Sequence, residues 1–222
     1  MPQAPSLKYI YEPKRGSYRA RNAGIRAAKG EIIAFIKKSA EPASYVEEYL
    51  ADKNMLSQRE SSKFFGFLPY AKTANAFYRK VVFDKIGLFE EKWVSGGDAD
   101  FCWRMKLQAN YKVSFSDGAV IFHKHRSSAG SLFKQTFKNG IGNSLLEKRY
   151  RQLHKAGLKD IIWRQVWFLK ALILVILLGP INKKRLPQPG KYSYLDAITC
   201  LGRELGRIAG FLKAIKPVNL RS

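Results

Sequence analysis

Residues 16–35 read GSYRARNAGIRAAKGEIIAF, a helix-like segment followed by a strand-like apolar run. Ser17 can cap a helix running to about Lys29, because its hydroxyl can accept a hydrogen bond from an amide of the first turn. Gly30 ends that helix, and the apolar run at 32–36 follows with the length of a strand. Hydrophobicity in this run is continuous, which is typical of a strand covered on both faces in a parallel sheet.

Outward from this stretch, strand-like and helix-like patterns continue to alternate, which predicts an α/β domain. Before it, KYIY at residues 8–11 is a short strand-like run. Beyond it, we expect strands at 64–68, 74–78, 112–116 and 119–123, and helices at 45–55, 79–86 and 99–109.

The character of the sequence changes after Phe133, where long helical patterns begin. We expect a helix over 133–158, an apolar stretch over 161–180 and an amphipathic helix over 194–215, whose apolar residues recur at three- and four-residue steps. In the last helix Gly202, Gly206 and Gly210 are four residues apart, so a second helix could approach closely. We therefore divide the chain into a domain at 1–150 and a basic helical region at 151–222.

The apolar stretch at 161–180 is nearly long enough to cross a bilayer. However, Arg164 and Lys170 lie in its first half, and charges within a span are costly. Trp163 and Trp167 are typical of a membrane interface. A re-entrant or interfacial helix is therefore our main interpretation, while a bilayer crossing and a buried helix of a soluble core remain alternatives.

The charge of the chain calls for an anionic partner. Its 222 residues include 40 Lys and Arg against 17 Asp and Glu, a net charge of +23, and 46% are hydrophobic, which excludes a disordered basic tail. Residues 1–117 carry a net charge of +7 and residues 118–222 carry +16. Since the sequence contains no recognised nucleic-acid-binding motif, we expect no nucleic acid and favour an anionic membrane surface.

The cysteine count and the first residues indicate the compartment. Cys102 and Cys200 form no CxxC motif, so a disulfide framework is not expected and the chain is interpreted as intracellular. The opening residues, MPQAPSLKYIYEPKRG, hold no apolar core of signal-peptide length. We expect a peripheral or monotopic protein at the cytoplasmic face of the membrane.

Three segments carry the candidate chemistry. The first is 16–35, and the second, at 73–105, reads TANAFYRKVVFDKIGLFEEKWVSGGDADFCWRM. The third is the His-x-His-Arg of His123, His125 and Arg126, followed by Lys134, Gln135 and Gly140. In this order, and over about residues 10–150, the segments resemble the family-2 inverting glycosyltransferases.

The resemblance implies an α/β fold with a Rossmann-like nucleotide-diphospho-sugar transferase sheet, the glycosyltransferase-A fold, followed here by a C-terminal helical extension. It also implies a nucleotide-sugar donor. Compared with the family pattern, the sheet is expected to be incomplete in its N-terminal half, because the strand–helix–strand unit that holds the base in the family is not recognisable.

The resemblance also assigns roles to single residues. Asp98 takes the place of the catalytic base, which removes the proton of the attacking acceptor hydroxyl. Asp100 and Arg104 are placed on the acceptor side, and Arg21 and Asn22 on the nucleotide side. Two alternatives stay open: Gly-Gly-Asp could simply form a turn and helix cap, and Arg104 could simply pair with Asp100 four residues earlier.

One departure from the family pattern concerns the metal. Family members carry an Asp-x-Asp motif after the buried strand and usually use Mg²⁺ or Mn²⁺, whereas this chain has Lys37, Lys38 and Ser39 there. We therefore expect no metal ligands and assign no cofactor. The two lysines either replace the metal in neutralising the donor diphosphate, or mark a metal site that has been lost. His123 is a further donor-side candidate, with a purely structural role as the alternative.

Two functions follow. The first is a glycosyltransferase that acts on a lipid-linked or polysaccharide acceptor at the cytoplasmic membrane face, within cell-envelope polysaccharide biosynthesis. The alternative is a catalytically impaired or split relative that binds membrane, glycan or a complementary glycosyltransferase fragment.

Overall fold

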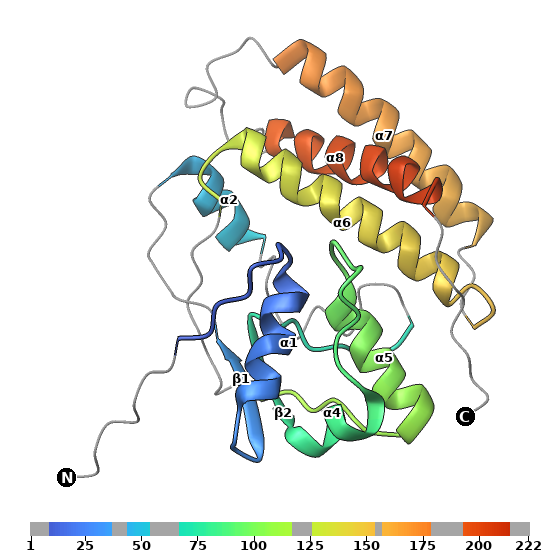
Figure 1. Cartoon of the computed structure of the whole chain (residues 1–222). Coiled ribbons are helices and arrows are strands. Elements are labelled where there is room, and N and C mark those ends of the chain that lie inside the picture. Colours follow the sequence, from blue (N-terminus) through green and yellow to red (C-terminus); the bar gives the residue numbers. More distant parts are fainter. Residues whose placement is uncertain are drawn as a thin grey trace.

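A computed structural model describes residues 9–36, 44–53, 67–116, 126–153, 157–178 and 193–213. Figure 1 shows two parts. In the lower part, helices surround a small two-stranded sheet, and in the upper part three long helices form a layer above them.

The segment at 16–35 folds into a helix followed by a strand, as predicted. Helix α1 spans Ser17–Ala27 and strand β1 spans Ile32–Ile36. The cap is not the predicted one, because the N-cap residue is Gly16 and no side chain caps the helix. Strand β2 (Asn75–Arg79), helix α4 (Lys80–Ile86) and helix α5 (Gly97–Ala109) complete this part, close to their predicted positions.

The pairing of β1 corrects the sequence-based expectation. Within the described residues β1 pairs only with β2, and the pairing is antiparallel, with Ile33 opposite Tyr78. Ile32 is 63% exposed and Ile33 only 7%, so the two faces of the strand differ. The predicted parallel strand covered on both faces is therefore wrong for this pair, because a short apolar run does not reveal which of its residues face solvent.

Four other predicted strands have different outcomes. Residues 9–11, 67–68 and 112–116 are described and form no strand. The rest of the 64–68 prediction, and all of the one at 119–123, lie outside the described residues. The observed structure is compatible with an incomplete α/β fold, in which the described sheet has two strands.

An aromatic core joins the sheet to α5. Phe83 and Phe101 stack with ring centroids 4.9 Å apart, and Phe89 lies 4.7 Å from Phe101. Tyr78 of β2 meets Phe101 edge-on at 5.5 Å. Phe101 is completely buried, so the first turns of α5 are fixed against β2 and α4 by apolar packing.

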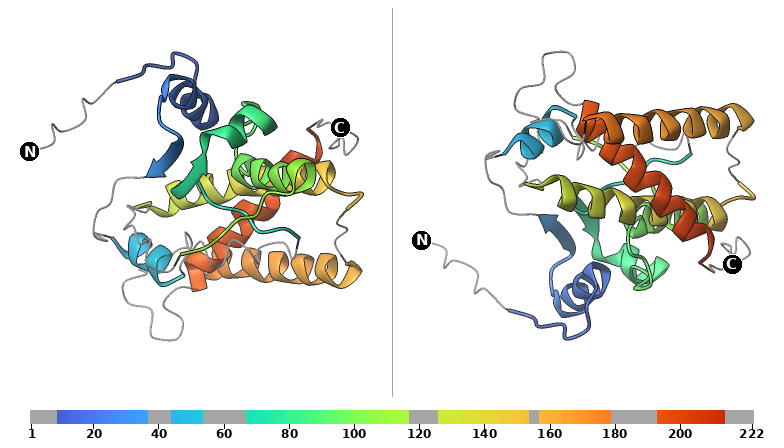
Figure 2. Two further views of the ribbon diagram at one scale, coloured as in Figure 1. Left: turned by 90° about the horizontal axis from the view of Figure 1, so that it is seen from below. Right: turned by 90° about the horizontal axis from the view of Figure 1, so that it is seen from above.

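The upper layer consists of α6 (Ala129–Arg149), α7 (Leu158–Leu178) and α8 (Ser193–Phe211). Helix α6 begins with a capping box formed by Ser128 and Ser131. Helix α8 packs against both α6 and α7 (Figure 2). The short helix α2 (Tyr45–Asp52) joins this layer, because the Tyr49 hydroxyl donates to Asp196 at 3.0 Å.

Glycines bring α6 and α8 into close contact, as the spacing of Gly202, Gly206 and Gly210 predicts. A Cβ on Gly206 would collide with the carbonyl of Phe137, and one on Gly140 with the carbonyl of Arg203.

The predicted boundary at residue 150 stays a prediction. Among the described residues, no helix combines the length and hydrophobicity that a membrane crossing requires.

We predict that Gly206→Ala lowers the free energy of unfolding by about 2 kcal/mol, because the added methyl group collides with rigid backbone of α6. The matched control is Gly130→Ala in the first turn of α6, where a Cβ meets nothing within 4 Å. Its stability should be unchanged or raised by up to about 1 kcal/mol. Urea unfolding measures both, and equal effects would contradict the close packing.

Candidate active site

Asp98 lies in the first turn of α5, where the first two sequence motifs meet. Its carboxylate accepts a hydrogen bond from the Tyr18 hydroxyl at 3.3 Å and from the Thr73 amide at 3.4 Å. Tyr18 belongs to the 16–35 segment, and Thr73 begins the 73–105 segment. The turn and helix cap of the alternative interpretation are also present, because Gly96 is the N-cap of α5, without a side-chain cap, and Asp98 follows in the first turn.

Tyr18 is a hydrogen-bond donor to Asp98 at neutral pH. Burial raises the pKa of its hydroxyl well above the ordinary value, and the nearby Asp98 carboxylate raises it further. The same hydroxyl oxygen accepts a hydrogen bond from the Gly97 amide at 2.9 Å. One side chain therefore contacts both the carboxylate and the backbone that carries it, which fixes the direction of the carboxylate.

The two glycines before Asp98 make this approach possible. Gly96 has φ 84°, a conformation that favours glycine. A Cβ on Gly97 would lie 2.7 Å from the Tyr18 ring, so any other residue there would push Tyr18 away. The Gly-Gly pair is thus explained by the contact between α1 and α5 as well as by the turn.

Asp100 is completely buried and has two guanidinium partners. Its carboxylate contacts Arg104 Nε at 3.1 Å and Arg149 Nε at 3.0 Å, and accepts a hydrogen bond from the Tyr150 hydroxyl at 2.9 Å. Burial raises the pKa of Asp100 above its ordinary value, while the two guanidinium groups oppose that rise. This geometry favours a role in holding α5 against α6.

Arg104 extends this anchor to the segment before α5. Its guanidinium donates to the carbonyl oxygens of Ile86 at 2.9 Å and Leu88 at 3.0 Å, besides pairing with Asp100. The predicted i, i+4 ion pair is therefore present. The assignment of Asp100 and Arg104 to the acceptor side stays a prediction, and at most they act there through the position of α5.

Glu90 is the second acidic partner of Arg149. Arg149 Nη2 lies 2.6 Å from its carboxylate, and Lys92 Nζ lies 2.8 Å from it. Burial alone would raise the pKa of Glu90, but these hydrogen bonds outweigh it and lower the pKa to about 2. Arg149 thus links the Glu90 loop and α5 to the end of α6.

Asn22 is buried between α1 and the loop that precedes α5. Its amide donates to the Phe89 carbonyl at 2.8 Å, and its oxygen accepts from the Phe89 amide at 3.2 Å. Only 1% of the residue is exposed. This geometry suits a residue that positions α1, and the predicted donor contact of Asn22 stays a prediction.

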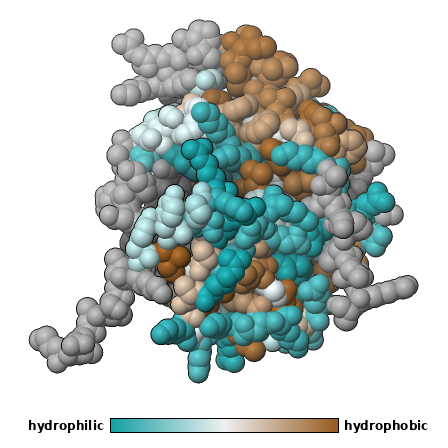
Figure 3. Space-filling view, in the orientation of Figure 1, coloured by the Kyte–Doolittle hydropathy of each residue, from teal (hydrophilic) through white to brown (hydrophobic). Residues whose placement is uncertain are grey.

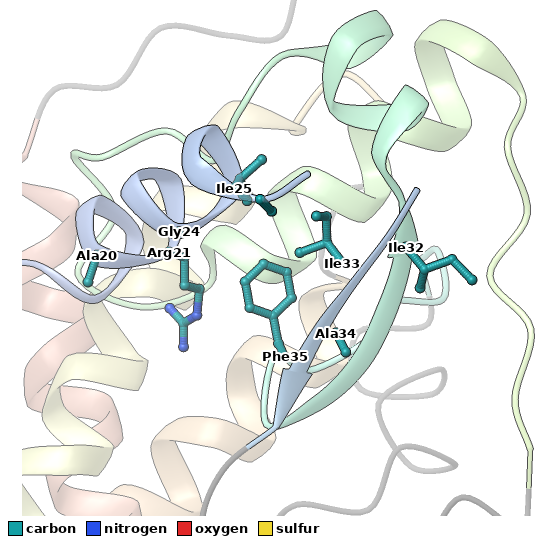
Figure 4. A pocket seen from close by; sticks show the side chains of 9 residues that line it. Ala20, Arg21, Gly24, Ile25, Ile32, Ile33, Ala34 and Phe35 are labelled. Atoms are coloured by element: carbon teal, nitrogen blue, oxygen red, sulfur yellow. The ribbon is translucent and has the colours of Figure 1, made fainter. Parts of the chain in front are cut away.

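Arg21 lines a pocket of about 470 Å³ between α1 and β1 (Figure 4). The small residues Ala20, Gly24 and Ala28 form its helical wall, and Phe35 points into it from β1. The Arg21 guanidinium lies 4.9 Å from the centre of the Tyr18 ring. The pocket is therefore apolar with one cation, and that cation lies beside the tyrosine that contacts Asp98.

The third sequence motif connects to the same loop through α6. Arg126 donates to Gln135 at 3.1 Å, and Gln135 donates to Asn139 at 3.1 Å. The Ser95 hydroxyl then donates to the same Asn139 oxygen at 3.0 Å, next to Gly96. This chain of hydrogen bonds runs from the motif to the turn that carries Asp98.

Four predicted donor-side residues, Lys37, Lys38, Ser39 and His123, lie outside the described residues. Within the parts of the chain that are described, no group of three His, Cys, Asp or Glu residues is arranged to hold a metal ion.

The chain is similar in sequence to a known protein. The chain is 28% identical to Glycosyltransferase AglE from Haloferax volcanii over an alignment of 218 positions, which covers 84% of this chain and 64% of the relative. The similarity supports a glycosyltransferase. The chain spans less than two thirds of that relative's length. No protein-family model matches it, and neither does any solved structure at a significant level.

Sequence reasoning missed the partners that orient these carboxylates. Tyr18 is 80 residues from Asp98, and Tyr150 is 50 residues from Asp100, so no local spacing could pair them. For Tyr18 a signal existed, because it lies inside the motif at 16–35. Arg149 and Tyr150 carry no such signal in a single sequence.

We predict that the stability gained from Glu90 depends on pH. Because its pKa falls from the ordinary 4.5 to about 2 on folding, its contribution is complete above about pH 4.5 and is lost as the pH falls toward 2. The free energy of unfolding should therefore be lower for Glu90→Gln than for the wild type at about pH 6, and the difference should shrink toward pH 2. Urea unfolding across this range measures it.

The control for this prediction is Glu31→Gln, which changes an exposed carboxylate just before β1. Its effect on stability should stay within about 0.5 kcal/mol at every pH. A Glu90→Gln difference that is constant with pH would contradict the ion pair with Arg149.

Proposed function

We propose that this protein is a family-2 inverting glycosyltransferase with a glycosyltransferase-A fold. It transfers a sugar from a nucleotide-diphosphate sugar to a lipid-linked or polysaccharide acceptor at the cytoplasmic face of the membrane. The observation that carries the proposal is the meeting of Tyr18, Thr73 and Asp98, because residues from two separate motifs orient one partly exposed carboxylate.

Asp98 acts in this proposal as the general base. An acceptor hydroxyl attacks the anomeric carbon of the donor, a new glycosidic bond forms, and the bond to the nucleoside diphosphate breaks with inversion. Asp98 takes the proton of the attacking hydroxyl. The hydrogen bonds from Tyr18 and Thr73 hold the carboxylate in one orientation, which lowers the entropic cost of reaching the transition state.

The pocket beside Arg21 is the proposed donor side. Its volume of about 470 Å³ lies within the usual range for small-molecule sites, and its apolar walls suit a nucleoside. The Arg21 guanidinium is suited to the negative charge of a diphosphate. Lys37, Lys38, Ser39 and His123 stay proposed donor-side residues, and no step of the mechanism passes through a metal.

A second candidate is a catalytically impaired relative that binds glycan, membrane or a complementary glycosyltransferase fragment. The replacement of Asp-x-Asp by Lys37, Lys38 and Ser39 favours it. The two candidates differ in turnover: both accommodate nucleotide binding, and only the enzyme transfers sugar.

We predict that Asp98→Asn lowers the transfer rate by at least about a hundredfold, because the amide cannot accept the proton. Binding of UDP- or GDP-sugar, measured by titration calorimetry with and without Mn²⁺, should change less than about threefold, since the amide keeps the shape of the side chain. The matched control is Asp84→Asn, an exposed residue of α4 that should keep full activity.

Two results would contradict the enzyme proposal. Wild-type protein that binds none of the nucleotide sugars under any condition excludes a donor site. An Asp98→Asn variant with wild-type turnover excludes Asp98 as the base. Donor binding without turnover in the wild type would favour the second candidate.

We predict further that Arg21→Gln weakens binding of the active nucleotide sugar by about tenfold, because a charge-assisted contact to the diphosphate is lost. The exposed Arg151→Gln variant serves as the control and should bind like the wild type. Equal affinities for Arg21→Gln and the wild type would place the diphosphate elsewhere.

A further inference from the structure

The outer side of α7 is a large apolar surface. Figure 3 shows it as a continuous brown area at the upper right, over α7. Six large apolar side chains of α7 that are each more than half exposed make up what we call the α7 face: Ile162, Trp163, Trp167, Leu169, Ile173 and Ile176. Exposed apolar surfaces of this extent mark interaction sites.

Helix α7 turns one of its charged side chains, Arg164, toward the protein. Arg164 lies 3.5 Å from Glu147 of α6 and 4.0 Å from Glu204 of α8. Ala171 is 3% exposed and packs in a cluster with Ala197 and Leu201 of α8. The inward side of α7 therefore has a small residue and an ion-paired arginine, and the large apolar side chains point outward. This is the reverse of the usual surface helix of a water-soluble protein, whose apolar side faces the core.

The charge of the part of the sequence that contains α7 indicates what covers this face. Residues 151–222 hold 14 Lys and Arg against 3 Asp and Glu, a net charge of +11. Lys159 and Lys170 of α7 itself are exposed, and Lys170 Nζ lies 4.7 Å from the centre of the Trp167 ring. A second copy of this chain would add a second cationic surface, whereas anionic lipid headgroups would neutralise it.

We propose that α7 lies in the plane of an anionic membrane leaflet, with the α7 face among the upper acyl chains and headgroups. Trp163 and Trp167, four residues apart, are 62% and 55% exposed, and such rings prefer the membrane interface. This docking surface is separate from the proposed transfer activity, because the α6 and α8 helices lie between α7 and α5 (Figure 1).

The first test is flotation of the full chain with vesicles of phosphatidylcholine containing about one third phosphatidylglycerol. Wild-type protein should float with these vesicles and bind pure phosphatidylcholine at least about tenfold more weakly. The Trp163→Gln/Trp167→Gln variant should lose about tenfold or more in binding, because two interfacial anchors are gone. Phe77→Gln is the control, since Phe77 is 58% exposed on β2, away from α7, and should float like the wild type.

The second test measures the orientation of the helix. Two variants are compared by the quenching of tryptophan fluorescence with brominated lipids. In the first, Trp163 and Trp167 are replaced by Phe and Ile176 is replaced by Trp. In the second, only Trp167 is replaced by Phe, so that Trp163 is retained. A helix in the membrane plane puts both indoles at the same shallow depth, whereas a helix along the membrane normal would separate them by roughly 20 Å, at 1.5 Å per residue. The buried Trp93 and Trp103 give a common background.

Several results would overturn this proposal. The first is wild-type protein that binds vesicles equally well with and without phosphatidylglycerol. The second is a double variant that floats like the wild type. The third is a tryptophan at position 176 that lies deep in the bilayer while Trp163 is shallow. A concentration-dependent dimer that the double variant abolishes, with no vesicle binding by the wild type, would assign the α7 face to a second copy instead. None of these outcomes depends on turnover, so failure here is distinguishable from failure of the transferase proposal.

Discussion

The placement of Asp98 depends on the ion pairs and the hydrogen bond of the buried Asp100 carboxylate. It is met by Arg104 from its own helix and by Arg149 and Tyr150 from the end of α6. A buried charge without such partners would lower the stability of the fold by several kcal/mol. Helix α5 is therefore strongly held in the one rotation that keeps these contacts. Residues two apart on a helix point in different directions, and with Asp100 turned inward Asp98 is directed toward Tyr18 and Thr73.

Contact with the helical layer therefore matters to the candidate site. Arg149 is the last residue of α6, and Tyr150 is its C-cap. Helix α6 packs on α8 through glycines that let the two backbones come into contact. The chain from Arg126 through Gln135 and Asn139 to Ser95 adds a polar link from α6 to the loop before Asp98. In this account the helical layer supports the site on one side and presents the α7 face on the other (Figure 1).

Local patterns in the sequence predicted much of this arrangement, and long-range pairing escaped them. The helix and strand of 16–35, the helices of 80–86 and 97–109, and the glycine contacts of α8 follow from hydrophobic periodicity and residue spacing. The antiparallel partner of β1 did not, because an apolar run of five residues looks the same in either kind of sheet. The motifs placed Asp98, but the residues that orient it are distant in sequence and become visible only in the fold.

The most direct test of the central claim, that Asp98 and its partners face a nucleotide donor, is amide chemical-shift mapping by NMR during titration with UDP or GDP. We predict that the largest changes cluster at Arg21, Thr73, Gly97 and Asp98, while Gly130 at the far start of α6 stays unchanged. Changes confined to other surfaces, or none at saturating nucleotide, would contradict it.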